Sequence, residues 1–197
     1  MADCWSCGAE RGVDFFCPTC GKIQAASPKT TLFEALGLPA RMRLERGDVD
    51  KAFREASRNV HPDRFAQAAP MERKLALQLT ELVNQAHQTL RDPRRRAEYL
   101  LKAEGVEVGH DQARTRDRAF LMEMLELQER VDETSEVAGL EQMLKDAKAR
   151  TKHLLAGLEA YLDDGVGEQA VAARAVEELR YMERLAERID AKLEEMY

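Results

Sequence analysis

Asn59-Val60-His61-Pro62-Asp63-Arg64-Phe65 joins two segments that both carry the apolar spacing of an amphipathic helix. Apolar residues recur three or four positions apart on each side of it, and the two sets are Val49, Phe53, Ala56 and Val60, and then Leu75, Leu79, Leu82 and Ala86. Pro62 lacks a backbone donor and disfavours helical dihedrals at His61, so the first helix must end there. The sequence therefore predicts an antiparallel pair of helices with His61-Pro62-Asp63 displayed at or near the connecting loop.

Three basic residues of the first predicted helix lie on one face. At about 100° per residue, Lys51, Arg54 and Arg58 fall opposite the apolar stripe. A solvated charged face is the ordinary meaning of such a row. Here the row leads directly to His61-Pro62-Asp63 on an otherwise acidic protein. It therefore predicts a local positive patch that steers an acidic partner.

The hairpin and its tripeptide resemble the J-domain, the co-chaperone module that stimulates ATP hydrolysis by DnaK-type chaperones. The downstream sequence resembles the end of such a domain and runs Asn84-Gln85-Ala86-His87-Gln88-Thr89-Leu90-Arg91-Asp92-Pro93, followed by Arg95, Arg96 and Tyr99. Its beginning is matched by Leu32-Phe33-Glu34-Ala35-Leu36-Gly37-Leu38-Pro39. The resemblance implies that the ATPase domain of the chaperone is contacted by Lys51, Arg54, Arg58, His61, Pro62 and Asp63.

Composition favours helices over sheet. Charged residues make up 34% of the 197 residues and aromatic residues only 6%, while leucine, alanine, glutamate and arginine abound. The formal net charge of -6 argues against general nucleic-acid binding, because phosphate contacts need a basic surface. No apolar run approaches the ~20 residues of a membrane span. The N-terminus resembles neither a signal peptide nor a transit peptide, so we expect a soluble, cytoplasmic protein.

All four cysteines lie near the N-terminus in two Cys-x-x-Cys pairs, each followed by glycine. In such knuckles the backbone N–H groups bond the sulfurs, and glycine takes the positive φ of the turn. The spacing predicts a tetrahedral structural zinc site whose ligands are Cys4, Cys7, Cys17 and Cys20. Two disulfides are disfavoured in a reducing compartment, whereas a rubredoxin-like iron site and a redox-active dithiol stay open from spacing alone.

So small a segment buries little surface, so the metal must supply its folding energy. Its aromatic residues are expected to form a small core or a docking surface rather than a platform for stacked bases; these are Trp5, Phe15 and Phe16.

Further helices follow from apolar spacing and from capping residues. A short helix at residues 32–36 is capped by Thr30 or Thr31 and stops at Gly37. Another helix runs from Pro70 to about Leu90, and a shorter one covers residues 94–102. From Thr115 on, three long segments with breaks near residues 134–135 and 163–167 predict an antiparallel three-helix bundle.

The first helix of this bundle has more apolar surface than one core stripe requires. Leu121, Met122 and Leu125 fall outside the stripe of Phe120 and Met124. Acidic residues border this second patch, and they are Glu126, Glu129 and Glu133. Either the patch packs against another part of the protein, or it is an apolar strip rimmed by acids where a partner docks.

Several phrases together resemble the HscB family, the J-type co-chaperones of iron–sulfur cluster biogenesis, called Jac-type in mitochondria. They include Leu36-Gly37-Leu38-Pro39-Ala40-Arg41, His61-Pro62-Asp63-Arg64-Phe65-Ala66, Ala97-Glu98-Tyr99-Leu100-Leu101 and Phe120-Leu121-Met122-Glu123-Met124-Leu125-Glu126-Leu127. The resemblance covers about residues 31–197. It implies an L-shaped molecule in which a J-domain packs against a three-helix bundle that holds the cluster scaffold protein. The scaffold-binding face of that family matches Leu121, Met122, Leu125, Glu126, Glu129 and Tyr181.

The chain departs from the family pattern at several positions. Val60 replaces an aromatic residue, His87 stands where a larger aromatic residue is usual, and Tyr181 replaces phenylalanine. The tyrosine hydroxyl needs water or a partner, so the contribution of Tyr181 carries over less directly. The tetracysteine segment is absent from the shortest bacterial members and resembles the extension of animal versions.

The resulting prediction is an all-α protein with four parts: a tetracysteine knuckle (1–24), a linker (25–30), a J-domain (31–104) and a scaffold-binding three-helix domain (105–197). It is expected to be a non-enzymatic co-chaperone that delivers an IscU-type scaffold to an HscA/DnaK-type ATPase. Weak homodimerisation is expected, and nucleic-acid or membrane partners are not. The alternatives are a general J-domain co-chaperone whose zinc knuckle serves other clients, and a thiol oxidoreductase.

Overall fold

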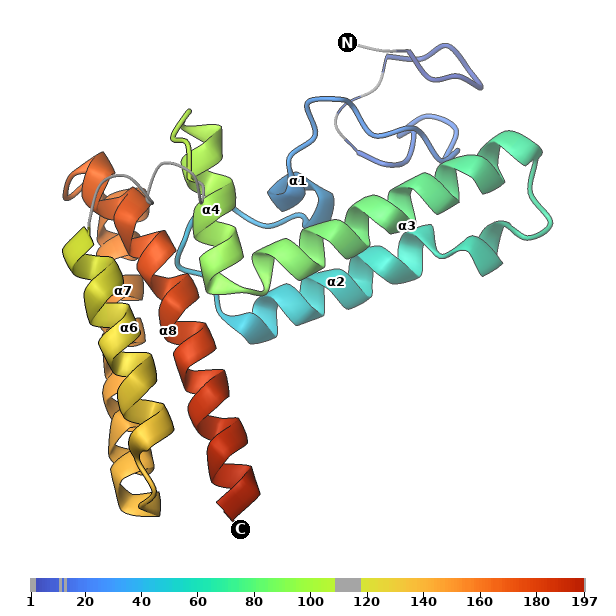
Figure 1. Ribbon diagram of the computed structural model, residues 1–197. Coiled ribbons are helices and arrows are strands. Elements are labelled where there is room, and N and C mark those ends of the chain that lie inside the picture. The colour runs from blue at the N-terminus through green and yellow to red at the C-terminus, as the bar shows by residue number, and fades with distance from the viewer. Residues whose placement is uncertain (1–2, 11, 13, 109–117, 197) are drawn as a thin grey trace. The chain divides into compact units, whose positions relative to one another are not determined.

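The computed structural model describes residues 3–10, 12, 14–108 and 118–196. The chain divides into two compact units, Met1–Asp92 and Pro93–Tyr197. The predicted all-α fold is confirmed, since the named elements of the described residues are all helical (Figure 1). None of these helices has the length and apolar character of a membrane span. The functional domain limits given above stay a prediction.

In the first unit, the chain forms α1 (Leu32–Leu36), α2 (Arg46–Val60), the 3-10 helix η1 (Pro62–Phe65) and α3 (Pro70–Leu90). Figure 1 shows α2 and α3 running antiparallel, which confirms the predicted hairpin. Helix α2 ends at Val60, as the proline requires. The turn of 3-10 helix after it was not predicted.

Local signals set the short first helix. Thr31 accepts a hydrogen bond from the backbone N–H of Glu34, and the Glu34 side chain accepts one from the backbone of Thr31, so the two residues form a capping box. Gly37 ends the helix with φ 65°, a conformation that glycine adopts without strain. Helix α1 packs against both α2 and α3, and the buried apolar residues of these elements and of the segment between α1 and α2 include Phe33, Leu36, Met42, Val49, Val60, Leu75, Leu79, Val83 and Ala86.

The second unit holds α4 (Pro93–Ala103), α6 (Arg118–Glu133), α7 (Val137–Asp164) and α8 (Gln169–Met196). The last three form the predicted antiparallel bundle, with its breaks where the sequence places them. The predicted start of the first bundle helix, at Thr115, lies outside the described residues. Helix α7 ends at Gly165, whose φ is 68°.

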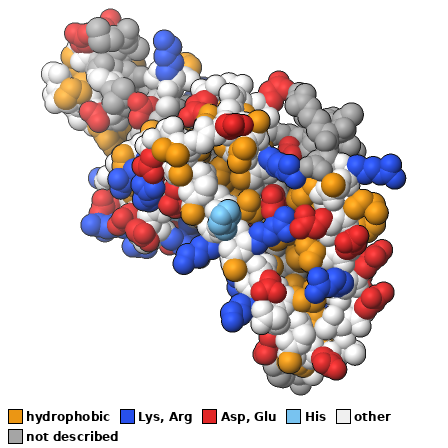
Figure 2. All heavy atoms as spheres, turned by 90° about the vertical axis from the view of Figure 1, so that its left-hand side faces the viewer, with side chains coloured by type: hydrophobic (Ala, Val, Ile, Leu, Met, Phe, Trp, Pro, Cys, Tyr) orange, Lys and Arg blue, Asp and Glu red, His pale blue; other side chains and the backbone are white. Residues whose placement is uncertain are grey.

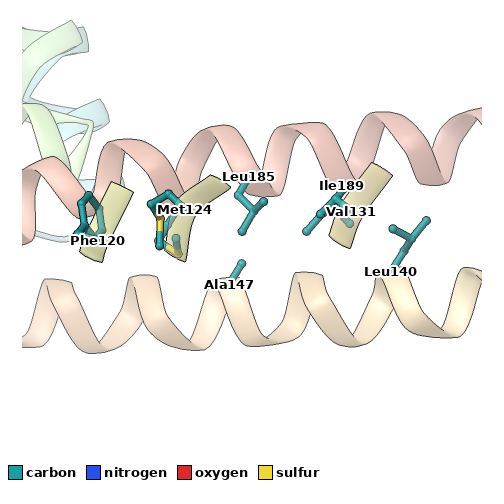
Figure 3. Packing of buried hydrophobic residues seen from close by; sticks show 8 residues of the cluster. Phe120, Met124, Val131, Leu140, Ala147, Leu185 and Ile189 are labelled. Carbon is teal, nitrogen blue, oxygen red and sulfur yellow. The ribbon is translucent and has the colours of Figure 1, made fainter. Parts of the chain in front are cut away.

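The bundle core is apolar and comes from all three helices. Figure 3 shows its side chains meeting in the space between α7 and α8. The buried members are Phe120, Met124, Val131, Leu140, Ala147, Met182, Leu185 and Ile189. Charged side chains on the bundle surface join α6 to α8. Arg188 pairs with Asp132 at 2.6 Å, and the Lys192 ammonium donates to the carbonyls of Val131 and Asp132 at the end of α6.

Candidate functional site

The His61-Pro62-Asp63 tripeptide lies at the junction of α2 and η1. His61 has φ -57° and ψ 129°, the extended conformation favoured before proline. Its Nδ1 accepts a hydrogen bond from the backbone N–H of Asp63 at 3.3 Å. The side chain of His61 is 52% exposed and that of Asp63 is 90% exposed. The tripeptide therefore projects its two ionisable groups into solvent.

Two side chains attach this loop to the hairpin. The Arg64 guanidinium donates to the carbonyls of Arg58 at 3.1 Å and Asn59 at 3.3 Å. The Thr80 hydroxyl on α3 lies 2.8 Å from the carbonyl of Ala76 and 3.2 Å from that of Val60, and its one proton is shared between them. The last carbonyls of a helix have no partner within it, so these contacts fix the end of α2. The tripeptide is displayed on an anchored turn.

The predicted basic row is in place. Lys51, Arg54 and Arg58 are exposed along α2, and the Arg58 Nε donates to the carbonyl of Arg54 at 3.2 Å. The structure thus brings the row and the tripeptide together on one continuous stretch of α2 and its C-terminal end.

The four cysteine sulfurs converge. They all lie within 4.8 Å of one another, with 3.6 Å between Cys4 and Cys20 and 3.8 Å between Cys7 and Cys17. A tetrahedral zinc ion with Zn–S bonds of about 2.3 Å separates its sulfurs by about 3.8 Å. The donor set and its spacing therefore fit a tetrahedral metal ion.

The two knuckles have the same backbone hydrogen bonds. Cys4 and Gly8 donate to Ala9 and Cys4 at 2.8 and 2.9 Å, and in the second knuckle Cys17 and Gly21 donate to Lys22 and Cys17 at 2.9 and 2.8 Å. Both glycines have φ 70°, as predicted for the turns. This geometry directs one pair of sulfurs from each knuckle toward the other.

The knuckles favour thiolates at two positions. Burial of the Cys4 thiol opposes its ionisation, yet backbone N–H groups of Cys7 and Ser6 lower its pKa to about 6. A backbone N–H of Cys20 lowers the pKa of Cys17. At Cys7 a backbone N–H of Ala9 favours the thiolate, but burial and the neighbouring sulfurs raise the pKa to about 12. A cation bound between the four sulfurs would favour the thiolate form at all four positions.

Gln24 is a site residue that sequence reasoning missed. It is 1% exposed, and its Nε2 lies 3.3 Å from the sulfur of Cys4 and 2.9 Å from the carbonyl of Lys22. This amide donates to a sulfur of the cysteine cluster from outside the cluster. A lone glutamine has no ligand spacing, so only the fold identifies it.

The cysteine segment is attached to α3. The Lys22 ammonium lies 3.0 and 3.1 Å from the two carboxylate oxygens of Glu72, which also accepts from the backbone N–H of Ala69 at 3.3 Å. The predicted aromatic core is only partly present: Phe15 and Phe16 are half-buried, whereas Trp5 is 42% exposed. The Trp5 indole donates to the carbonyl of Ile23 at 2.6 Å.

The predicted scaffold-binding residues of the bundle differ in exposure. Met122 and Leu125 are each 50% exposed, whereas Leu121 is half-buried and packs against the bundle core. Tyr181 also packs against the core, edge-on to Phe120 with 5.3 Å between ring centroids. The acidic pair Glu126 and Glu129 is exposed. Met122 and Leu125 are therefore the exposed large apolar side chains of α6, while Val171 on α8 is 62% exposed.

Charge is mixed over the surface in view. Figure 2 shows acidic, basic and hydrophobic side chains interspersed on the face that it presents, without an extended basic area there. This agrees with the acidic net charge of the whole chain.

Two family models match the chain, a DnaJ domain over residues 31–99 and the HSCB C-terminal oligomerisation domain over residues 116–190. A co-chaperone protein HscB homolog of Burkholderia mallei (strain SAVP1) is 38% identical over 173 residues, which cover 86% of this chain and 98% of the relative. The homolog of Burkholderia multivorans (strain ATCC 17616 / 249) is 34% identical over the same length.

Solved structures show the same similarity. The human co-chaperone protein HscB aligns with a TM-score of 0.86 and 28% identity, over 97% of this chain and 98% of the human one. The chaperone HscB from Vibrio cholerae aligns with a TM-score of 0.76 and 31% identity, over 85% of this chain and 100% of that chain. The similarity extends across both units of the fold.

Proposed function

This chain belongs to the HscB family of J-domain co-chaperones of iron–sulfur cluster assembly, and we propose that it binds an IscU-type scaffold protein and delivers it to an HscA/DnaK-type ATPase. A co-chaperone of this family is not an enzyme. Its effect is on the chaperone, whose ATP hydrolysis it stimulates.

The observation that carries this proposal is the anchored, exposed His61-Pro62-Asp63 turn. Asp63 presents its carboxylate to solvent, while Arg64 and Thr80 hold the backbone around it. The basic row steers α2 onto an acidic surface, and the turn then makes the short-range contacts. The proposed chaperone-binding residues are Lys51, Arg54, Arg58, His61, Pro62 and Asp63. Docking there must stabilise the hydrolysis-competent state of the chaperone more than its resting state.

The scaffold is proposed to bind the bundle through α6 and α8. Two half-exposed apolar side chains beside exposed acids have the composition of a docking surface with a polar rim. Met122 and Leu125 supply the apolar contact area, and Leu121 and Tyr181 support them from the core. The proposed set is Leu121, Met122, Leu125, Glu126, Glu129 and Tyr181. A weak homodimer through the C-terminal domain is also proposed, in keeping with the oligomerisation domain named by the matching family model.

The cysteine cluster is proposed to hold a structural zinc ion through Cys4, Cys7, Cys17 and Cys20. Four sulfurs leave no position open for a substrate, so the metal would supply folding energy to the knuckles and no reaction. This role requires reduced thiols, which is consistent with a cytoplasmic location.

A steady-state ATPase assay with the cognate HscA/DnaK-type chaperone tests the proposal. The chain alone should raise ATP turnover, and the scaffold with the chain should raise it further than either alone. If the scaffold-saturated chain did not raise the ATP turnover of the chaperone, the proposed function would be refuted. Stimulation with other clients but not with the scaffold would instead favour a general J-domain co-chaperone.

A further inference from the structure

The first unit contains a groove of about 540 Å³ that neither proposed docking surface uses. One wall comes from the second cysteine knuckle, and the other comes from α1 and α2. The lining residues include Asp14, Phe15, Phe16, Glu34, Glu55 and Ala56. Its volume is within the range of about 300–1,000 Å³ that is typical of ligand pockets.

The chemistry of this groove is apolar and acidic. Phe15, Phe16 and Ala56 are half-buried along it. Every charged residue that lines it is acidic, and the three are exposed: Asp14, Glu34 and Glu55. The Oε2 of Glu34 also accepts a hydrogen bond from the backbone N–H of Thr31 in the cap of α1, at 2.7 Å. The groove therefore suits a ligand that is both hydrophobic and cationic.

The groove uses a different face of α2 from the basic row. At about 100° per residue, Ala52, Ala56 and Asn59 fall about 100° or more from Arg54 and Arg58, whereas Glu55 at the groove edge lies only about 40° from Lys51. Glu55 therefore lies where the groove meets the basic row. A ligand in the groove would lie beside the tripeptide, since Asn59 and Val60 line the groove.

We propose that this groove binds a short peptide segment of a partner protein that carries lysine or arginine among small hydrophobic residues. The apolar walls accept the hydrophobic side chains, and Asp14, Glu34 and Glu55 pair with the cations. Because residues 14–18 form one wall, the site exists only when the cysteine knuckles are folded. The proposal goes beyond the co-chaperone function and does not depend on it.

A binding experiment with the metal-loaded full chain tests this site. The probe is a short fluorescein-labelled peptide of alternating leucine and arginine, and its counterpart has glutamate in place of arginine. Fluorescence anisotropy should show binding of the arginine peptide alone, weakening by about tenfold between ~50 and ~300 mM salt. Amide chemical shifts should change at residues 14–18, 34–37 and 52–60. Binding of both peptides alike, or shift changes confined to other residues, would overturn the proposal.

Charge reversal with a matched control separates this site from general attraction to an acidic protein. Asp14→Lys with Glu55→Lys should weaken binding of the arginine peptide about tenfold or more. Glu81→Lys with Glu141→Lys changes the net charge equally at exposed positions outside the groove, and binding should stay within about twofold. Equal losses in both pairs would overturn the proposal. The proposal would also be overturned if the protein were a dimer and only Asp14→Lys with Glu55→Lys dissociated it, because the groove would then bind a second copy of this chain.

Discussion

The Nε2 of His87 on α3 lies 2.7 Å from the Oδ1 of Asp50 on α2. The same oxygen lies 2.8 Å from the Nε of Arg91, and the His87 ring stacks on Phe53 with 4.0 Å between ring centroids. These contacts of Asp50, which we call the Asp50–His87 latch, join the start of α2 to the end of α3. The tripeptide lies at the other end of the hairpin. The His87 ring thus supplies both a stacking surface for Phe53 and a hydrogen bond to Asp50.

The latch predicts that the stability of the protein depends on the ionisation of Asp50. The hydrogen bond from His87, opposed by burial and supplemented by Arg91, lowers the pKa of Asp50. A folded-state pKa below the unfolded value of about 3.9 stabilises the fold above that pH, and the contribution is lost as pH falls through the folded pKa. Asp50→Asn should therefore lower the Tm at pH 7, and the difference from the wild type should shrink below about pH 4.

Thermal denaturation across this pH range, followed by circular dichroism, makes the measurement. The control is Asp48→Asn, an exposed carboxylate on the same helix, which should leave the Tm nearly unchanged. If Asp50→Asn lowered the Tm equally at pH 7 and pH 3, the loss would come from packing rather than from the charge of Asp50.

Sequence alone was sufficient for the helices whose ends have local causes. Pro62 ends α2 whatever surrounds it, and Thr31 with Gly37 brackets α1. The hydrogen bond between His87 and Asp50 could not be predicted from the sequence, because the two residues are brought together only when the hairpin folds. The same holds for Gln24 beside Cys4, since a single amide has no recognisable spacing before the chain folds.

Metal removal is expected to unfold the cysteine segment and leave the helices intact. The knuckles have little apolar core of their own, whereas α1, α2 and α3 share a buried one. Chelation should release about one zinc ion per chain. It should also increase proteolysis before residue 25 and leave helical circular dichroism nearly unchanged. Metal analysis and limited proteolysis check this prediction. The metal-free control is the double variant Cys17→Ser and Cys20→Ser. A chelated chain that lost most of its helix would show that the metal supports the hairpin.

Asp63→Asn should remove stimulation of the chaperone without affecting the fold. The Asp63 side chain is 90% exposed, so its replacement should alter stability by no more than about 0.5 kcal/mol. ATP turnover by the cognate chaperone should fall to its basal rate, while scaffold binding measured by calorimetry stays at the wild-type affinity. Glu81→Gln, an exposed acid on α3, is the matched control and should stimulate normally. Full stimulation by Asp63→Asn would contradict the proposed role of the turn.

The bundle shows where periodicity stops being informative. The apolar stripe of α6 correctly separates the core residues Phe120 and Met124 from a second patch. It does not reveal that Leu121, one position along, still packs against the core. That depends on how closely α8 approaches α6, which no local pattern encodes. Leu121 is therefore a poor probe of binding, because its truncation also disturbs packing.

Met122→Ala with Leu125→Ala is the cleaner test of the scaffold-binding surface. Each side chain is 50% exposed, so the pair should cost little stability, about 1 kcal/mol or less. If these side chains form the centre of the interface, their truncation should weaken scaffold binding by about tenfold or more. Calorimetry of the full chain with the scaffold measures the affinity, and thermal denaturation measures stability. Met124→Ala is the contrasting variant, because Met124 is 3% exposed and its loss should cost about 2–5 kcal/mol. If the double variant lost as much stability as Met124→Ala, Met122 and Leu125 would belong to the core. If it bound the scaffold with normal affinity, the scaffold-binding surface would have to lie elsewhere on the protein.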